Sequence, residues 1–254
     1  MSVDTSKYNN RFYNQHWRRV TAGIILSKML KILPETNSAV DFGCGLGIWL
    51  AVLRKLGVKE IKGYDGNWID KETLEIPKAC FTVADLSQTV SVEKRYDLAI
   101  SIEVAEHLPE KSAKIFVETL TKASDIVLFS AAIPWQRGVN HINEQWQGYW
   151  YKLFHEFGYI GMDIRSLIWN DSRIGVAQRQ NIMLYVKKDK VSSINISEKY
   201  YRLTDKYINF VHPELYLKRN VWVVPLFELY KIAIKRTIKK LTFVKLYNLK
   251  FLRK

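Results

Sequence analysis

The sequence predicts an α/β fold: a doubly wound, mostly parallel sheet of seven strands, with an N-terminal helix before it and a basic, helical C-terminal extension after it. Two observations indicate this fold. Short apolar runs alternate with amphipathic helical runs between residues 35 and 188, as in sheets whose strands are joined by crossover helices. Three glycines at every second position, Gly43, Gly45 and Gly47, separate the first apolar run from the first crossover helix. A chain of 254 residues can bury one large core and still carry an extension.

The expected elements follow the chain in order. An amphipathic pattern from Val20 to Leu33, stopped by Pro34, predicts the N-terminal helix, and two further patterns predict crossover helices at 46–56 and 111–123. Strands are expected at residues 39–42, 60–65, 80–86, 96–102, 125–132, 159–164 and 180–186. The chain therefore divides into an N-terminal helical segment (1–34), the sheet domain (35–188) and the C-terminal extension (189–254).

The glycine turn is the most informative motif. Glycine lets the backbone turn sharply and lets a ligand approach main-chain atoms without meeting a Cβ. The dinucleotide fingerprint needs a small third residue at position 48, where this chain has Ile48. The spacing G-x-G-x-G, with Asp41 two residues before it, resembles the first motif of class I S-adenosylmethionine-dependent methyltransferases. The resemblance implies their Rossmann-like fold, an antiparallel finish to the sheet and S-adenosylmethionine as cofactor; a glycine turn without a ligand is the alternative.

The same resemblance implies a role for the N-terminal segment, as a lid over the cofactor, and a set of binding residues. Asp65, 18 residues after Gly47, would accept hydrogen bonds from both ribose hydroxyls, or else simply end its strand in a turn. Asp85 would receive the adenine amino group, or else cap a helix. The implied cofactor-binding residues are Asp41, Gly43, Gly45, Gly47, Asp65, Asp85, Leu86 and Glu103, with the Leu86 main-chain N–H at an adenine ring nitrogen and Glu103 at the methionine end.

A carboxylate and histidine pattern follows the fourth expected strand. Glu103-x-x-Glu106-His107 resembles the motif of ubiquinone-pathway O-methyltransferases that bind a divalent metal, and these side chains are metal ligands. Many metal-free methyltransferases carry the same Glu-His-Leu sequence. We therefore expect no metal, with a site at Glu103, Glu106 and His107 as the alternative and local packing of Glu106 and His107 as the plainer reading.

The loop after the fifth expected strand supplies the catalytic candidate. His-x-Asn-Glu-Gln-Trp from His141 to Trp146, followed by Tyr149-Trp150, resembles methyltransferases found among sugar and surface-glycan modification genes. A histidine in this loop can remove a hydroxyl proton, since its unperturbed pKa of ~6.5 suits that work. His141 is the predicted base; a loop histidine bonded to Glu144, or one that orients the substrate, is the alternative.

Charge and cysteine content indicate which partners and which compartment to expect for the chain. Of the net charge of +14, residues 189–254 contribute +10, with 15 Lys and Arg against 5 Asp and Glu. An amphipathic basic pattern at 225–254 predicts peripheral binding to an anionic membrane, with docking on its own domain or a second subunit as the alternative. Nucleic acid is disfavoured because no reading motif is present. Two isolated cysteines and no signal-peptide core indicate a cytoplasmic protein.

The function expected from these patterns is O-methylation of a sugar hydroxyl in glycan or polysaccharide biosynthesis. The runner-up is O-methylation of a quinone, an aromatic or another lipid-like small molecule, assisted by metal. A third class is a binding module that keeps the cofactor fold without catalysing a reaction.

Overall fold

A computed structural model describes residues 15–197 and 208–220. The chain divides into two compact units, Met1–Leu215 and Tyr216–Lys254. In the second unit the structure describes only the end of helix α6 (Pro213–Asn220), so the predicted membrane helix at 225–254 lies outside the described residues. Among the helices that are described, none combines the length and the apolar character needed to cross a membrane.

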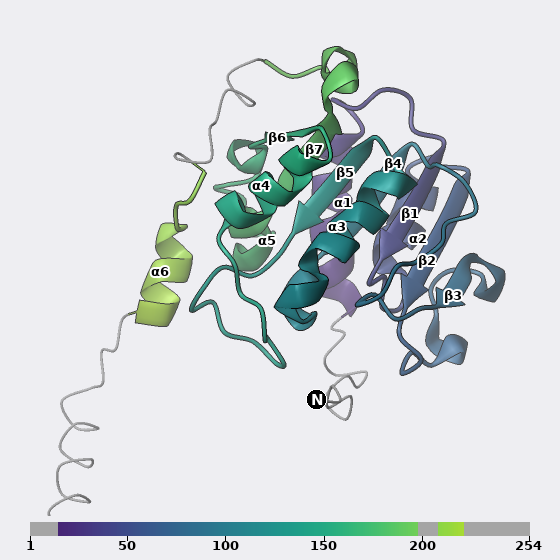
Figure 1. Cartoon of the computed structure of the whole chain (residues 1–254), viewed down its shortest axis with the longest axis horizontal. Helices are drawn as coiled ribbons and strands as arrows, with labels where there is room; N and C mark the ends of the chain where they lie inside the picture. The colour runs from purple at the N-terminus through teal and green to yellow at the C-terminus, as the bar shows by residue number, and fades with distance from the viewer. Residues whose placement is uncertain (1–14, 198–207, 221–254) are drawn as a thin grey trace, which may run out of the picture. The chain divides into compact units, whose positions relative to one another are not determined.

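The first unit is built on a seven-stranded sheet in the order β3-β2-β1-β4-β5-β7-β6 (Figure 1). All neighbouring strands are parallel except β7, which is antiparallel to both β5 and β6. The strands are β1 (Ser38–Phe42), β2 (Glu60–Asp65), β3 (Phe81–Val83), β4 (Leu98–Ile102), β5 (Ile126–Ser130), β6 (Tyr159–Met162) and β7 (Met183–Lys187). The predicted fold class is therefore confirmed, including its antiparallel finish.

Helices cover both faces of the sheet, so its strands are buried on two sides. Alternate residues of β4 show the two layers: Leu98 and Ile100 join one apolar core, and Ala99 joins the other. The first core contains residues of α1 (Gln15–Met29), α2 (Ile48–Lys55) and the chain around α5 (Val176–Asn181). The second contains residues of α3 (Ala113–Ala123) and α4 (Gln147–Glu156). Figure 1 shows α3 and α4 in front of the sheet, with α1 and α2 behind it.

The last strand differs from its prediction. It was expected to begin at Gln180, whereas β7 begins at Met183 and Gln180 and Asn181 end helix α5. Both side chains are buried, with exposures of 0% and 2%. Their amide groups make hydrogen bonds to other segments, and these tertiary bonds override the apolar pattern that suggested a strand.

After β7 the chain comes back to the domain at residues 208–214, here called the return segment. Arg165 donates to the Ile208 carbonyl at 3.0 Å and stacks on the Phe210 ring. Gln180 donates to the Phe210 carbonyl at 2.7 Å, and Arg179 forms an ion pair with Glu214. The return segment therefore contacts α5 and the chain that follows β6.

Candidate active site

The glycine turn between β1 and α2 requires its glycines. Gly43 and Gly47 have φ angles of 84° and 82°, in the left-handed region that L-residues with a side chain avoid. A Cβ on Gly43 would lie 2.3 Å from the Val104 side chain, and one on Gly47 would lie 2.8 Å from Ile76. Gly45 also has a positive φ, of 54°. The turn therefore depends on glycine for its backbone conformation and for its packing.

Two aspartates lie at the carboxyl ends of β1 and β2, beside this turn. Asp65 accepts hydrogen bonds from the main-chain N–H groups of Gly45 and Gly66, both at 2.7 Å. Burial nevertheless raises the pKa of Asp65 to about 6. Asp41 is buried, and burial together with the Asp65 charge raises its pKa well above the usual range. Oδ2 of Asp41 has no hydrogen-bond partner among the described residues, so it is an acceptor suited to a bound donor group.

Asp85 follows β3 and is exposed. Its Oδ1 accepts hydrogen bonds from the main chain and the hydroxyl of Ser87, at 2.9 and 2.7 Å. Leu86 beside it is buried. No helix begins at Asp85, so these bonds close a local turn and the helix cap given as its alternative is wrong; the adenine role remains a prediction.

Glu103 lies just beyond β4 with a φ of 56°, a strained conformation for a residue with a side chain. Its carboxylate accepts one hydrogen bond from Gln136 Nε2 and one from Asn181 Nδ2, both at 3.0 Å. Neither amide was among the predicted site residues. The only signal in the sequence was a pair of polar residues, Gln180 and Asn181, at the start of a run expected to be an apolar strand.

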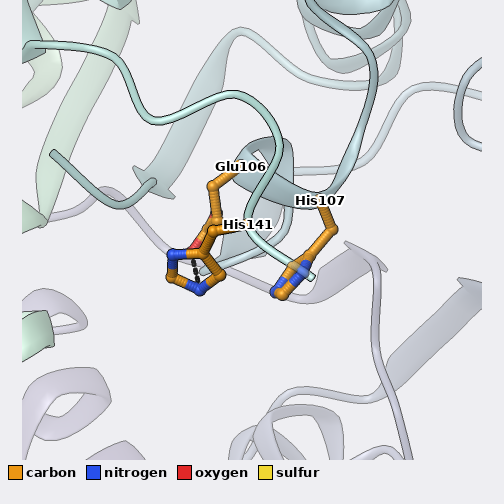
Figure 2. Close-up of side chains that lie close together, drawn as sticks. All are labelled: Glu106, His107 and His141. Carbon is orange, nitrogen blue, oxygen red and sulfur yellow. Dashed lines mark ion pairs between the residues drawn. The ribbon is translucent and has the colours of Figure 1, made fainter. Parts of the chain in front are cut away.

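A second cluster joins Glu106 and His107 to His141, which comes from the loop after β5 (Figure 2). One ligand atom from each residue lies within 4.8 Å of the other two. Glu106 is fully buried, and neither of its carboxylate oxygens has a hydrogen-bond partner among the described residues. Burial and the Glu103 charge raise its pKa well above the usual range. Burial and the neighbouring His141 lower the pKa of His107 to about 4.

His141 is oriented from one side by Glu144, whose Oε1 lies 2.9 Å from Nδ1. That contact makes Nδ1 the protonated nitrogen and leaves Nε2, 4.0 Å from Glu106 Oε1, free to accept a proton. The contact with Glu144 is the one expected in the alternative reading, and it suits a base as well. The loop is strained, since Trp135, Arg137 and Asn140 all have positive φ angles.

The structure thus brings together many of the residues that the sequence selected, in two groups. Asp41 and Asp65 border the glycine turn at β1 and β2, whereas His141 meets Glu106 and His107 beyond β4 and β5. Glu103, predicted in the alternative metal set, directs its carboxylate to amide groups, while His141 completes the three-residue group. The structure therefore offers Glu106, His107 and His141 as candidate ligands for a metal ion.

Comparison with known families agrees with this geometry. A family model described as a methyltransferase domain matches residues 14–160, more than half of the chain. The chain belongs to this methyltransferase family. The prediction of a class I S-adenosylmethionine-dependent methyltransferase is confirmed, and S-adenosylmethionine is its methyl donor.

Individual relatives are distant. The ribosomal protein L11 methyltransferase of Dictyoglomus thermophilum is 29% identical over 122 residues, which cover 44% of this chain and 38% of that protein. The structure of phosphoethanolamine N-methyltransferase 1 of Haemonchus contortus, in complex with phosphoethanolamine and S-adenosylhomocysteine, matches with a TM-score of 0.50 at 15% identity, covering 68% of this chain and 43% of that one. The small RNA methyltransferase HEN1 matches with the same TM-score at 16% identity, covering 69% of this chain and 26% of that one. These structural likenesses show the fold.

The residues at the glycine turn fit the methyl donor. The unpartnered Oδ2 of Asp41 is an acceptor suited to an ammonium group, and the Asp65 carboxylate at the next strand end suits a pair of hydroxyls. Glycines at the turn keep side chains away from the main chain there. When bound, S-adenosylmethionine supplies a methyl group on a positively charged sulfur; the chain itself has to align that group with an acceptor.

Proposed function

We propose that the enzyme methylates a hydroxyl group, with His141 as the base. The main support for this proposal is the position of His141, which lies between Glu144 and Glu106 on the β4 and β5 side of the sheet. The residues of the glycine turn that fit the donor lie on β1 and β2, so an acceptor bound near His141 would approach the donor from the β4 and β5 side.

The chemistry follows from these contacts. As the hydroxyl oxygen bonds to the methyl carbon, the carbon–sulfur bond breaks and leaves S-adenosylhomocysteine. The hydroxyl proton passes to Nε2 of His141, while Glu144 holds Nδ1 and stabilises the imidazolium that forms. A hydroxyl needs such a base because its proton must leave as the new bond forms.

A sugar hydroxyl is the acceptor we favour, as part of a glycan or polysaccharide pathway. Support comes from the His141 to Trp146 segment and from aromatic side chains near it: Trp135 is 73% exposed and Trp146 38%, so both rings are accessible to a sugar face. Trp150, by contrast, is buried and belongs to the core. Association of residues 225–254 with an anionic membrane would suit a lipid-linked acceptor.

The test is methyl transfer from radiolabelled S-adenosylmethionine to a panel of nucleotide sugars, oligosaccharides and lipid-linked sugars. Changing His141 to Gln should lower the rate ~10²–10⁴-fold, as loss of a general base does, without weakening the binding of S-adenosylhomocysteine. His155→Gln, which changes a histidine of α4 outside the cluster, is the matched control. Transfer at the wild-type rate by the His141 variant would refute the base assignment.

A metal-assisted transfer to a quinone or aromatic hydroxyl is the second candidate, favoured by the grouping of Glu106, His107 and His141. An ion there would be held by one carboxylate and two imidazoles, and it would make a bound hydroxyl more acidic. In that case His141 acts as a ligand instead of as the base. Activity that survives chelation unchanged, with no rise in melting temperature on adding Mn²⁺ or Mg²⁺, would dismiss this candidate.

A further inference from the structure

Glu103, Gln136 and Asn181 form a polar group, here called the amide–carboxylate cluster, that borders the glycine turn. Strand β4, which ends just before Glu103, pairs in parallel with β1. The next residue, Val104, packs so closely on Gly43 that a Cβ there would meet its side chain at 2.3 Å. The cluster therefore lies beside the turn whose residues fit the methyl donor.

We propose that Gln136 and Asn181 are positioning residues that hold the Glu103 carboxylate toward the cationic amino-acid end of S-adenosylmethionine. Gln136 Nε2 donates to Oε2 of Glu103, and Asn181 Nδ2 donates to Oε1, each at 3.0 Å. The two amides are also tied together, because Asn181 Nδ2 lies 2.9 Å from Gln136 Oε1. Each carboxylate oxygen is thereby fixed and still keeps a lone pair for an ammonium hydrogen.

Both groups that donate hydrogen bonds to the Glu103 carboxylate are neutral amides. An amide orients a carboxylate without cancelling its charge, whereas a lysine or arginine would neutralise it. A fixed, uncancelled carboxylate suits a ligand that carries both an ammonium and a sulfonium charge.

Burial separates the roles of the three residues. Gln136 and Asn181 are 5% and 2% exposed, so they can act only through their buried neighbours, whereas Glu103 is partly exposed and can meet a ligand. The strained backbone of Glu103, with its φ of 56°, is held by the surrounding structure, as is common where a side chain must be aimed at a ligand.

The position of Asn181 is fixed in turn by the hydrogen bonds of its neighbour in α5. Its neighbour Gln180 donates to the Phe210 carbonyl at 2.7 Å and accepts a hydrogen bond from the main chain of His212. The end of α5 thus connects the return segment on one side to Glu103 on the other. The cluster therefore depends on residues beyond position 160, where the match to the methyltransferase family ends.

This role rests on the methyl donor binding at the glycine turn, and it is independent of which acceptor is used. Two nucleosides test it in calorimetric titrations. S-Adenosylhomocysteine carries the amino-acid end, and 5′-methylthioadenosine has the same adenosine and sulfur without it. Asn181→Ala and Gln136→Ala should each weaken S-adenosylhomocysteine binding about tenfold or more, as expected for lost hydrogen bonds to a charged group, and change 5′-methylthioadenosine binding less than twofold.

Two matched controls are available: Asn170→Ala removes an exposed amide, and Gln145→Ala removes an amide that donates to the Asn143 side chain, outside the amide–carboxylate cluster. Neither should change the affinity for either nucleoside. Gln136→Ala keeps the test decisive if Asn181→Ala does not fold, because the two residues lie on different elements.

Equal losses for both nucleosides in the cluster variants would show a general loosening and overturn the positioning role. Unchanged binding of both would overturn it as well, because Glu103 would then not contact the donor. A folded wild-type protein that binds neither nucleoside would overturn the donor assignment itself, together with this proposal.

Discussion

Replacing Gly43 with alanine tests the packing of the glycine turn against β4. The chain offers a matched reference in Gly158, whose φ of 80° is close to the 84° of Gly43. A Cβ on Gly158 would meet nothing within 4 Å, whereas one on Gly43 would lie 2.3 and 2.8 Å from the two γ-methyl groups of Val104. The two substitutions therefore share the backbone strain and differ in the overlap.

The magnitudes follow from these two contributions. A left-handed conformation costs an alanine ~1–2 kcal/mol relative to glycine, so Gly158→Ala should lose about that much free energy of unfolding. Overpacking adds ~1–3 kcal/mol, so Gly43→Ala should lose ~2–5 kcal/mol. Adding Val104→Ala to Gly43→Ala removes both γ-methyl groups and so relieves part of the overlap. The double-mutant cycle should therefore show a coupling energy of ~1–3 kcal/mol between the two positions.

Urea unfolding gives the free energies, and calorimetry with S-adenosylhomocysteine gives the affinities. Gly43→Ala should also weaken the binding of S-adenosylhomocysteine, because the substitution displaces the glycine turn. Gly158→Ala should leave this affinity unchanged. Equal losses of stability for the two glycine variants, or a cycle without coupling to Val104, would refute the reasoning.

Three further changes have defined outcomes. Since burial raises the pKa of Asp65 to about 6, its carboxylate takes up a proton as the pH falls through that value, and S-adenosylhomocysteine affinity should fall ~tenfold between pH 7 and 5; a titration series checks this, and Asp65→Asn should flatten the profile. Arg165→Ala leaves the Asp163 carboxylate, now 2.7–2.8 Å from the guanidinium, without its partner, so it should cost ~3–5 kcal/mol in urea unfolding; a loss below 1 kcal/mol would contradict the burial argument. Glu144→Gln should lower the methyl-transfer rate, because the neutral amide no longer stabilises the imidazolium that forms on His141; an unchanged rate would count against the pair.

The fold, and the position of Asp41 and Asp65 beside the glycine turn, could be predicted because their signals are local. The glycine spacing, Asp41 and Asp65 lie within one strand–turn–helix–strand unit, so their relative positions follow from short stretches of sequence. The parallel order of the sheet brings the carboxyl ends of these strands to one edge, which is why the spacing from Gly47 to Asp65 carried information.

The acceptor side was less accessible to sequence reasoning. His141 was predicted as a base, but its meeting with Glu106 and His107 depends on how the loop after β5 folds back over the end of β4. Gln136 and Asn181 were missed, since a buried amide is recognisable only from its partner, and Glu103 lies 33 and 78 residues away. Arg179 is another buried polar residue whose partners, the Trp169 carbonyl and Glu214, lie outside its own helix.

The return segment bears on how small this protein can be made. Arg165 and Arg179 are 1% and 5% exposed, and residues 208–214 provide acceptors for both guanidinium groups. A version of the chain that stopped after the last strand would uncover two cations and the amide side chain of Gln180 at once. The sheet would keep its seven strands, yet the truncated protein would lose the Phe210 and His212 main-chain groups that bond Gln180, the neighbour of Asn181.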